Sequence, residues 1–226
     1  MKYFLVFLIA ASLISCNTTS PKPSTEQKTA NDDVSELSYI EQLAHANGFE
    51  AWSDVKELQF SFNVDNNGKE FKRDWRWLVD QDKVYMKVDS EEVGIDINKN
   101  PDQQIHQAFI NDTYWLLFPF QLMWSDGYEH EINEKVVSPF HEKELTELVI
   151  NFKDEGGYTP GDTYKLYING DFKIEEWSFY PAESDEPRII NAWENYKTYE
   201  GIDISTDRRN ADGSFRIFFT DIAVTK

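Results

Sequence analysis

Cys16 carries the only thiol in this chain of 226 residues. A cysteine sulfur can act as a nucleophile, form a disulfide or carry a lipid. Cys16 follows Met1, Lys2 and an apolar run over residues 3–14, a layout that is typical of secretion signals. Because about 20 apolar residues are needed to cross a bilayer, this shorter run predicts a signal peptide and not a membrane span. Without a second cysteine, no internal disulfide can form.

The residues Leu13-Ile14-Ser15-Cys16 resemble the lipobox of bacterial lipoproteins. In that family the cysteine receives a diacylglycerol, the peptide bond before it is cut, and the new amine is acylated. The resemblance implies a signal peptide at 1–15, a lipidated Cys16 and attachment to a membrane through it, since two or more chains anchor stably. The alternative is that Cys16 simply ends an ordinary signal sequence.

Residues 17–33 contain, besides proline, no apolar side chain larger than that of Ala30. This composition predicts a disordered tether over residues 16–34. Some surface-exported lipoproteins carry acidic residues directly after the cysteine, whereas the four residues after Cys16 are Asn-Thr-Thr-Ser. The expected location is therefore the bacterial envelope, lipid-anchored at the outer membrane and facing the periplasm.

An EF-hand calcium loop is one chemistry that the spacing of polar residues suggests. Its positions one, three, five, six and twelve are matched by Asn63, Asp65, Asn67, Gly68 and Asp74. The match is poor, because position twelve is Asp where Glu belongs and strands are expected on both sides. A hairpin turn is favoured. The acidic cluster of Asp89, Glu91, Glu92 and Asp96 likewise favours a solvated loop over a cation site.

Catalytic patterns are weak throughout the chain. The histidines form no short-spaced pair, and no free cysteine remains to complete a zinc set; they are His45, His106, His130 and His141. No Gly-x-Ser-x-Gly elbow and no glycine-rich phosphate loop occurs. We therefore predict no catalytic residue, no metal and no cofactor, with a hydrolase kept as a third hypothesis after a binding protein and an envelope interaction protein.

Aromatic residues make up 15% of the chain and suggest either a ring-filled core or an apolar cavity. Trp75 and Trp77 stand two apart on an expected strand and so share a face, as do Phe60 and Phe62. Core packing is the simpler interpretation, and a cavity with an aromatic mouth is the other. The candidate ligand-binding residues are Phe60, Phe62, Trp75, Trp77, Trp115, Leu116, Phe118, Leu122 and Trp124.

Period-two alternation predicts the elements that would position these side chains. A helix over 35–47, capped by Ser35, precedes three strands around residues 57–64, 71–79 and 84–88. Further strands are expected at 146–152, 164–168, 172–179, 189–196, 201–205 and 215–224. Asn169-Gly170 is the strongest signal for a two-residue turn. Residues 101–111 look helical and lead into an aromatic segment, 114–124, that is either core plug or cavity wall.

This order of elements resembles the lipoprotein-carrier fold of LolA and LolB. The segment Asn111 to Phe120 (NDTYWLLFPF) also looks like one in uncharacterised bacterial lipoproteins related to that fold. The resemblance implies a mainly β (α+β) domain over residues 35–226, in which a strongly curved antiparallel sheet of about 9–11 strands forms an unclosed half-barrel. It also implies an N-terminal helix and a central helical insertion.

The formal net charge of −19 would become −20 after loss of Lys2 with residues 1–15. Such a surface repels phosphate and excludes nucleic acid as a partner. The expected function is that of a membrane-anchored lipoprotein which binds an acyl chain or lipid in lipid or lipoprotein handling. The alternative is a structural lipoprotein of the envelope with a packed core, whose partner is another envelope protein.

Overall fold

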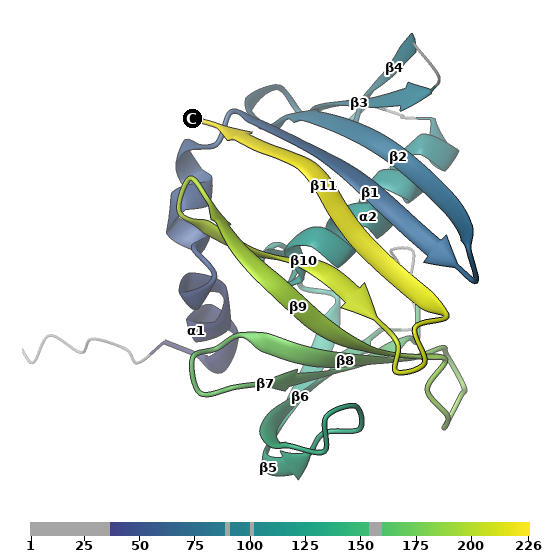
Figure 1. Cartoon of the computed structure of the whole chain (residues 1–226). Coiled ribbons are helices and arrows are strands. Elements are labelled where there is room, and N and C mark those ends of the chain that lie inside the picture. Colours follow the sequence, from purple (N-terminus) through teal and green to yellow (C-terminus); the bar gives the residue numbers. More distant parts are fainter. Residues whose placement is uncertain (1–36, 89–90, 100–101, 154–159) are drawn as a thin grey trace, which may run out of the picture. The chain divides into compact units, whose positions relative to one another are not determined.

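Eleven antiparallel strands form one open sheet in the computed structural model (Figure 1). The sheet order is β4-β3-β2-β1-β11-β10-β9-β8-β7-β6-β5, and the edge strands β4 and β5 do not pair, which confirms the predicted unclosed half-barrel. The strands are β1 (Glu57–Asn66), β2 (Lys69–Leu78), β3 (Lys83–Val88), β4 (Glu91–Asp96), β5 (Tyr128–Val137), β6 (Glu144–Phe152), β7 (Thr163–Ile168), β8 (Ile174–Tyr180), β9 (Ile189–Tyr199), β10 (Ile202–Arg209) and β11 (Phe215–Thr225).

The structure describes residues 37–88, 91–99, 102–153 and 160–226, all within the unit Leu37–Lys226. The predicted signal peptide, the tether and the lipidated Cys16 lie outside the described residues and stay predictions. Within the described part, no helix is both long and apolar enough to cross a bilayer.

Register shifts bend the strands. The β1–β11 pairing shifts between Gln59 and Ser61, and the β5–β6 pairing shifts between Asn133 and Val136. Asp221 and Lys135 lie at these two shifts with φ of 54° and 57°. An extra residue on one strand increases its local bend and twist. These bulges contribute to the curvature that gives the sheet its concave side.

A short seam divides the sheet between β10 and β11. These strands pair only through Asp207–Arg209 and Arg216–Phe218, whereas β1 pairs with β11 along nearly its whole length. Figure 1 shows β10 and β11 diverging from this short contact. The seam therefore joins a ribbon of β4, β3, β2, β1 and β11 to a ribbon of the other six strands.

Helix α1 (Tyr39–Ala46) is capped by Ser38 and not by Ser35, the predicted N-cap, which lies outside the described residues. Ser38 and Glu41 form a reciprocal capping box, and this satisfies backbone donors that would otherwise lack partners. The helix is followed by a 3-10 turn, η1 (Phe49–Asp54), reached through Gly48 at φ 88°. A side chain at Gly48 would collide with the carbonyl oxygen of Gly201, so this approach to the β9–β10 hairpin requires glycine.

Helix α2 (Gln103–Trp124) unites the predicted helix at 101–111 with the aromatic segment. It connects the two edges of the sheet, since it follows β4 and precedes β5, and in Figure 1 the sheet curves around it. A one-turn 3-10 helix, η2 (Val79–Gln81), follows β2, so Val79 lies just beyond the strand in which we expected it.

Two Asn-Gly pairs behave differently, and the prediction for the second is wrong. Asn67 and Gly68 both have positive φ and form the two-residue turn between β1 and β2. At Asn169-Gly170 neither residue has positive φ, and Phe172 takes that conformation instead. The side-chain oxygen of Asn169 accepts hydrogen bonds from the backbone of Asp171 and Lys173, which closes a longer loop.

Candidate functional site

A cavity of about 930 Å³ lies between α2 and the concave side of the sheet. Its strand wall includes Val64 of β1, Tyr164 of β7, Phe179 of β8, Ile189 of β9, and Phe215 and Ile217 of β11. Ile110, Tyr114 and Trp115 of α2 form the helical wall. This volume is within the range of about 300–1,000 Å³ that small-molecule sites occupy, and the walls are mostly apolar.

A kink in α2 directs its aromatic side chains to two different places. Pro119 has no N–H to bond the carbonyl of the preceding turn, and its ring crowds that carbonyl. Leu117 accordingly leaves the helical region with φ −124° and ψ 36°. Phe118 packs on Trp177 of β8 at 5.1 Å between ring centroids, and Phe120 packs on Phe49 of η1 at 5.3 Å.

A buried ion pair fixes α2 against β2 at the cavity wall. Asp112 is fully buried and accepts two hydrogen bonds from Arg73, at 2.7 Å from Nε and 2.6 Å from Nη2. The indole N–H of Trp75 donates to the same carboxylate at 2.7 Å. Burial raises the pKa of Asp112, while the donors from Arg73, Asn111 and Trp75 oppose that rise.

The structure separates the nine candidate ligand-binding residues into two groups. Phe62, Trp115 and Trp124 line the cavity, although their binding of a ligand stays a prediction. The other six lie in the packed core and do not line this cavity; they are Phe60, Trp75, Trp77, Leu116, Phe118 and Leu122.

Ring contacts explain the packing of two of those residues, Trp75 and Trp77. Phe109 of α2 inserts between Trp75 and Trp77, at 5.4 and 5.2 Å between ring centroids. Trp52 of η1 covers Trp77 from the other side at 5.2 Å. In such edge-to-face and tilted contacts the rings fill the space near η1, so an apolar face alone does not imply a free volume.

The cavity rim combines exposed aromatic rings with polar groups. Phe71 is 48% exposed and Trp124 is 41% exposed, and both line the cavity. Lys153 and Asp162 add charges at the rim. Deeper in, burial raises the pKa of Tyr114 and of Tyr164, so both phenols remain neutral at ordinary pH.

The EF-hand-like residues form the β1–β2 hairpin, which confirms the favoured interpretation. Their oxygens are used within the protein, since Asp65 accepts from the backbone of Gly68 and Asp74 accepts from Ser61. Across the part of the chain that the structure describes, no three His, Cys, Asp or Glu side chains gather to hold a metal.

The acidic segment 91–96 is strand β4 and not the solvated loop that we expected. It pairs along its whole length with β3, from Glu91 opposite Val88 to Asp96 opposite Lys83. Glu92 accepts two hydrogen bonds from Arg76 of β2. Glu92 and Asp96 alternate with the buried Ile95 and so lie on the outer face of this edge strand. Charges on an edge strand help to keep it from pairing with another chain.

Glu176 is a buried carboxylate that the sequence did not single out. It accepts hydrogen bonds from Ser138, from the backbone of Phe140 and from His141. Nδ1 of His141 also lies 2.8 Å from Glu176. Because all these partners belong to the turn between β5 and β6, Glu176 holds that turn and its role is structural.

No protein-family model and no curated protein matches the chain. Among solved structures, the chain is similar to a DUF1329 family protein from Desulfovibrio piger, with 8% identity and a TM-score of 0.48 over 82% of this chain and 91% of that one. It is also similar to a LolA superfamily protein from Nitrosomonas europaea, with 11% identity and a TM-score of 0.48 over 83% and 92% of the two chains. These likenesses concern the fold and assign no ligand.

Proposed function

We propose that this protein binds an apolar ligand, an acyl chain or a lipid, in the cavity of its half-barrel. The observation that carries the proposal is the apolar cavity of about 930 Å³ between α2 and the sheet, with the exposed rings of Phe71 and Trp124 at its rim. Burial of apolar surface contributes about 25 cal/mol per Å², so a long hydrocarbon chain can bind there without a polar partner. No catalytic step belongs to this proposal.

Native mass spectrometry of the purified full chain tests the proposal. We expect a co-purified lipid, or uptake of a fluorescent fatty acid by the delipidated protein. Val64→Trp, which places an indole in the cavity, should weaken this uptake at least tenfold. Val137→Trp is the matched control, because Val137 lies on β5 and is 66% exposed. A protein that neither carries lipid nor takes up the probe would refute the proposal and favour the alternative of an envelope interaction protein with a packed core.

The cellular part of the proposal is a lipid anchor at Cys16, with the domain at the outer membrane and facing the periplasm. It is supported by the lipobox-like residues Leu13 to Cys16 and by the polar residues that follow. A domain on a tether could collect its ligand from the membrane surface and transfer it in lipid or lipoprotein handling.

Metabolic labelling with an alkyne fatty acid, followed by membrane fractionation, tests the anchor. The full chain should be labelled and sediment with outer membranes, and Cys16→Ala should be unlabelled and soluble. Equal labelling of both chains would refute acylation at this position.

A further inference from the structure

Arg208 of β10 is a fully buried cation that pairs with no carboxylate among the residues that the structure describes. The carbon at the centre of its guanidinium lies 3.9 Å from the ring centroid of Trp193 and 4.9 Å from that of Phe219. Nη1 donates to the carbonyl oxygen of Ser205 at 2.6 Å. Within the described part of the chain, Nε and Nη2 have no hydrogen-bond partner. A buried charge is strongly unfavourable unless it is paired and hydrogen-bonded.

The two unpartnered nitrogens form the edge of the guanidinium that binds carboxylates in a bidentate pair. In four of the five other arginines the same edge is occupied. Nε and Nη2 donate to both oxygens of one carboxylate in Arg73 with Asp112, Arg76 with Glu92, Arg209 with Glu194 and Arg216 with Asp207. Arg208 therefore lacks the anion that these four arginines have.

The neighbouring acid does not supply that anion. Asp207 is next to Arg208 on β10, and successive residues of a strand point to opposite faces. Its carboxylate accepts hydrogen bonds from Arg216, at 2.8 Å from Nε, and from Asn195. The missing partner must therefore come from outside the described side chains.

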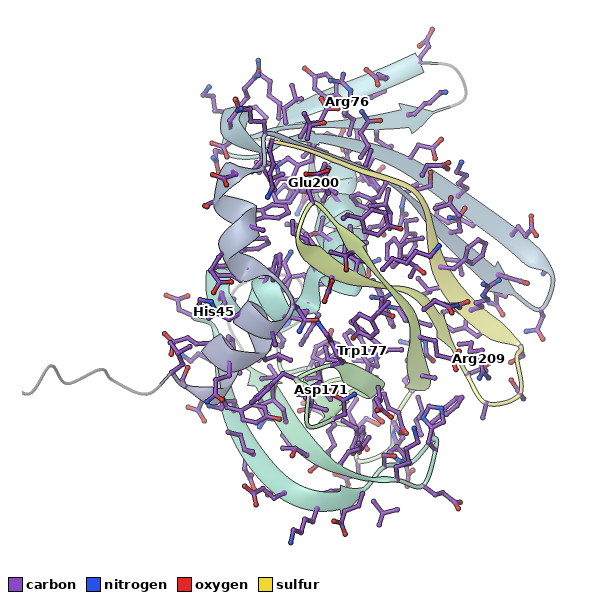
Figure 2. All side chains as sticks on the ribbon, turned by 60° about the vertical axis from the view of Figure 1, so that its left-hand side comes forward. His45, Arg76, Asp171, Trp177, Glu200 and Arg209 are labelled. Carbon is purple, nitrogen blue, oxygen red and sulfur yellow. The ribbon has the colours of Figure 1, made fainter. Side chains whose placement is uncertain are left out.

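Strand register places Arg208 next to the cavity wall. Arg208 is opposite Ile217 on β11 and opposite Trp193 on β9, and directly opposite residues share a face of the sheet. Ile217 lines the cavity. Trp193 stacks at 5.6 Å on Trp177, which also lines the cavity and which Figure 2 labels in the interior. Arg208 therefore lies beside a cavity-lining residue on the same face of the sheet, although it does not line the cavity itself.

The same region contains further buried polar atoms without partners. They are both side-chain polar atoms of Asn191 and the indole nitrogens of Trp177 and Trp193. Asn191 is opposite Trp177 in the β8–β9 register, so it faces the same side. Buried polar groups are nearly always hydrogen-bonded in native proteins. Apart from the Asn191 oxygen, all these atoms are hydrogen-bond donors. A ligand group that binds to them would have to accept hydrogen bonds.

We propose that Arg208 binds the carboxylate of a ligand whose apolar chain occupies the cavity, which makes the ligand a long-chain fatty acid bound with its head group inward. The proposal rests on the proposed function and names its ligand. Because Arg208 is fully buried and does not line the cavity, the head group must displace Ile217 or the Trp193 ring to reach it. Desolvation lowers the pKa of Arg208 to about 9, so the guanidinium is still charged at neutral pH.

Titration of the purified, delipidated full chain with palmitic acid and with hexadecanol tests this. The two ligands share a chain length, but only the acid carries a charge. We expect the wild type to bind palmitate at least tenfold more tightly than hexadecanol, and Arg208→Met to bind both equally. Equal affinities in the wild type, or a preference that survives in Arg208→Met, would overturn the proposal. If the wild type binds neither ligand, the proposed function fails as well.

Two further measurements guard against a folding defect in the variant. Arg209→Met is the matched control (Figure 2 labels Arg209). Arg209 is the next residue, its side chain is 41% exposed, and it pairs with Glu194. It should keep the full preference for palmitate. In the wild type, the carboxyl group of bound [1-13C]palmitate should stay ionised well below the pH at which the free fatty acid titrates, as measured by the 13C chemical shift of its carboxyl carbon. A titration like that of the free acid would contradict contact with Arg208.

Discussion

Arg73 and Arg208 both lie on the concave face of the sheet, and they differ in what meets the guanidinium. Arg73 donates hydrogen bonds to both oxygens of Asp112 on α2, and the indole N–H of Trp75 donates a third hydrogen bond to the same carboxylate. Arg208 lies between two aromatic rings with its Nε and Nη2 unpartnered. The first arginine joins two elements of the fold, whereas the second retains an unfilled binding capacity that the fold does not use.

This difference bears on how a buried charge should be interpreted. A satisfied pair cannot be broken on one side without leaving the other charge buried, whereas removal of an unsatisfied charge can relieve the folded state. The two arginines should therefore respond to the same substitution with opposite signs, although both are replaced by the same apolar side chain.

The largest effect is expected for Arg73→Met. It leaves the fully buried Asp112 without its cation and should lower the free energy of unfolding by about 3–5 kcal/mol. Burial already raises the pKa of Asp112, and loss of Arg73 raises it further. When folding raises the pKa of a carboxyl group, the folded protein loses stability as the pH rises through that raised pKa. The difference in stability between the variant and the wild type should therefore be largest at neutral pH and shrink towards about pH 4. Urea unfolding at several pH values measures this; a loss that is independent of pH would contradict it.

Arg208→Met should change stability in the opposite direction. Without ligand, removal of an unpaired buried cation should raise the free energy of unfolding by about 1–2 kcal/mol, after the loss of its two ring contacts. Urea unfolding of the delipidated protein measures the change. A loss as large as that of Arg73→Met would show that Arg208 is a structural residue.

Trp75→Phe and Trp177→Phe sharpen the comparison at the level of single hydrogen bonds. Both indoles are buried to a similar extent, but only the N–H of Trp75 has a partner, Asp112. A hydrogen bond to a charged group contributes about 1.5–3 kcal/mol, so Trp75→Phe should cost about that much more than Trp177→Phe. Equal losses in thermal or urea unfolding would mean that the Trp75 bond contributes nothing.

The smallest effect is expected for Arg209→Met. Its pair with Glu194 is partly exposed on both sides, and such pairs contribute less than about 1 kcal/mol. The unfolding midpoint should stay close to that of the wild type. A large shift would indicate that the β9–β10 hairpin depends on this surface pair.

Most central strands were predictable, and the edge strands were not. Strands β1, β6 and β11 have alternating apolar residues because one face is packed and the other is solvated. The edge strands β4 and β5 are largely exposed, and charges such as Glu91, Glu129 and Glu131 obscure any alternation. Edge protection thus removes the signal by which a strand is recognised.

The site was predictable only where it is apolar. The pattern of aromatic residues in the sequence indicated Phe62, Trp115 and Trp124, which line the cavity. The same pattern also indicated residues that lie in the packed core, such as Phe60 and Trp75. The pair of Arg73 and Asp112 joins positions 39 apart, and no local pattern indicates it. Arg208 stands in a charged run that looks solvated, although Ile202 and Ile204 place it at even spacing along a buried strand.

The seam between β10 and β11 has a mechanical consequence. Among the described residues, the β10–β11 ladder has three residue pairs, and Arg208 with Ile217 is the central pair. Bending stiffness across a sheet depends on the ladder that resists it, so a change of curvature should concentrate along this line. We expect the backbone amides beside the seam to exchange with deuterium faster than those in the β1–β11 ladder. Widening of the half-barrel around a bound molecule would then displace β10, the strand that carries Arg208, before the other strands.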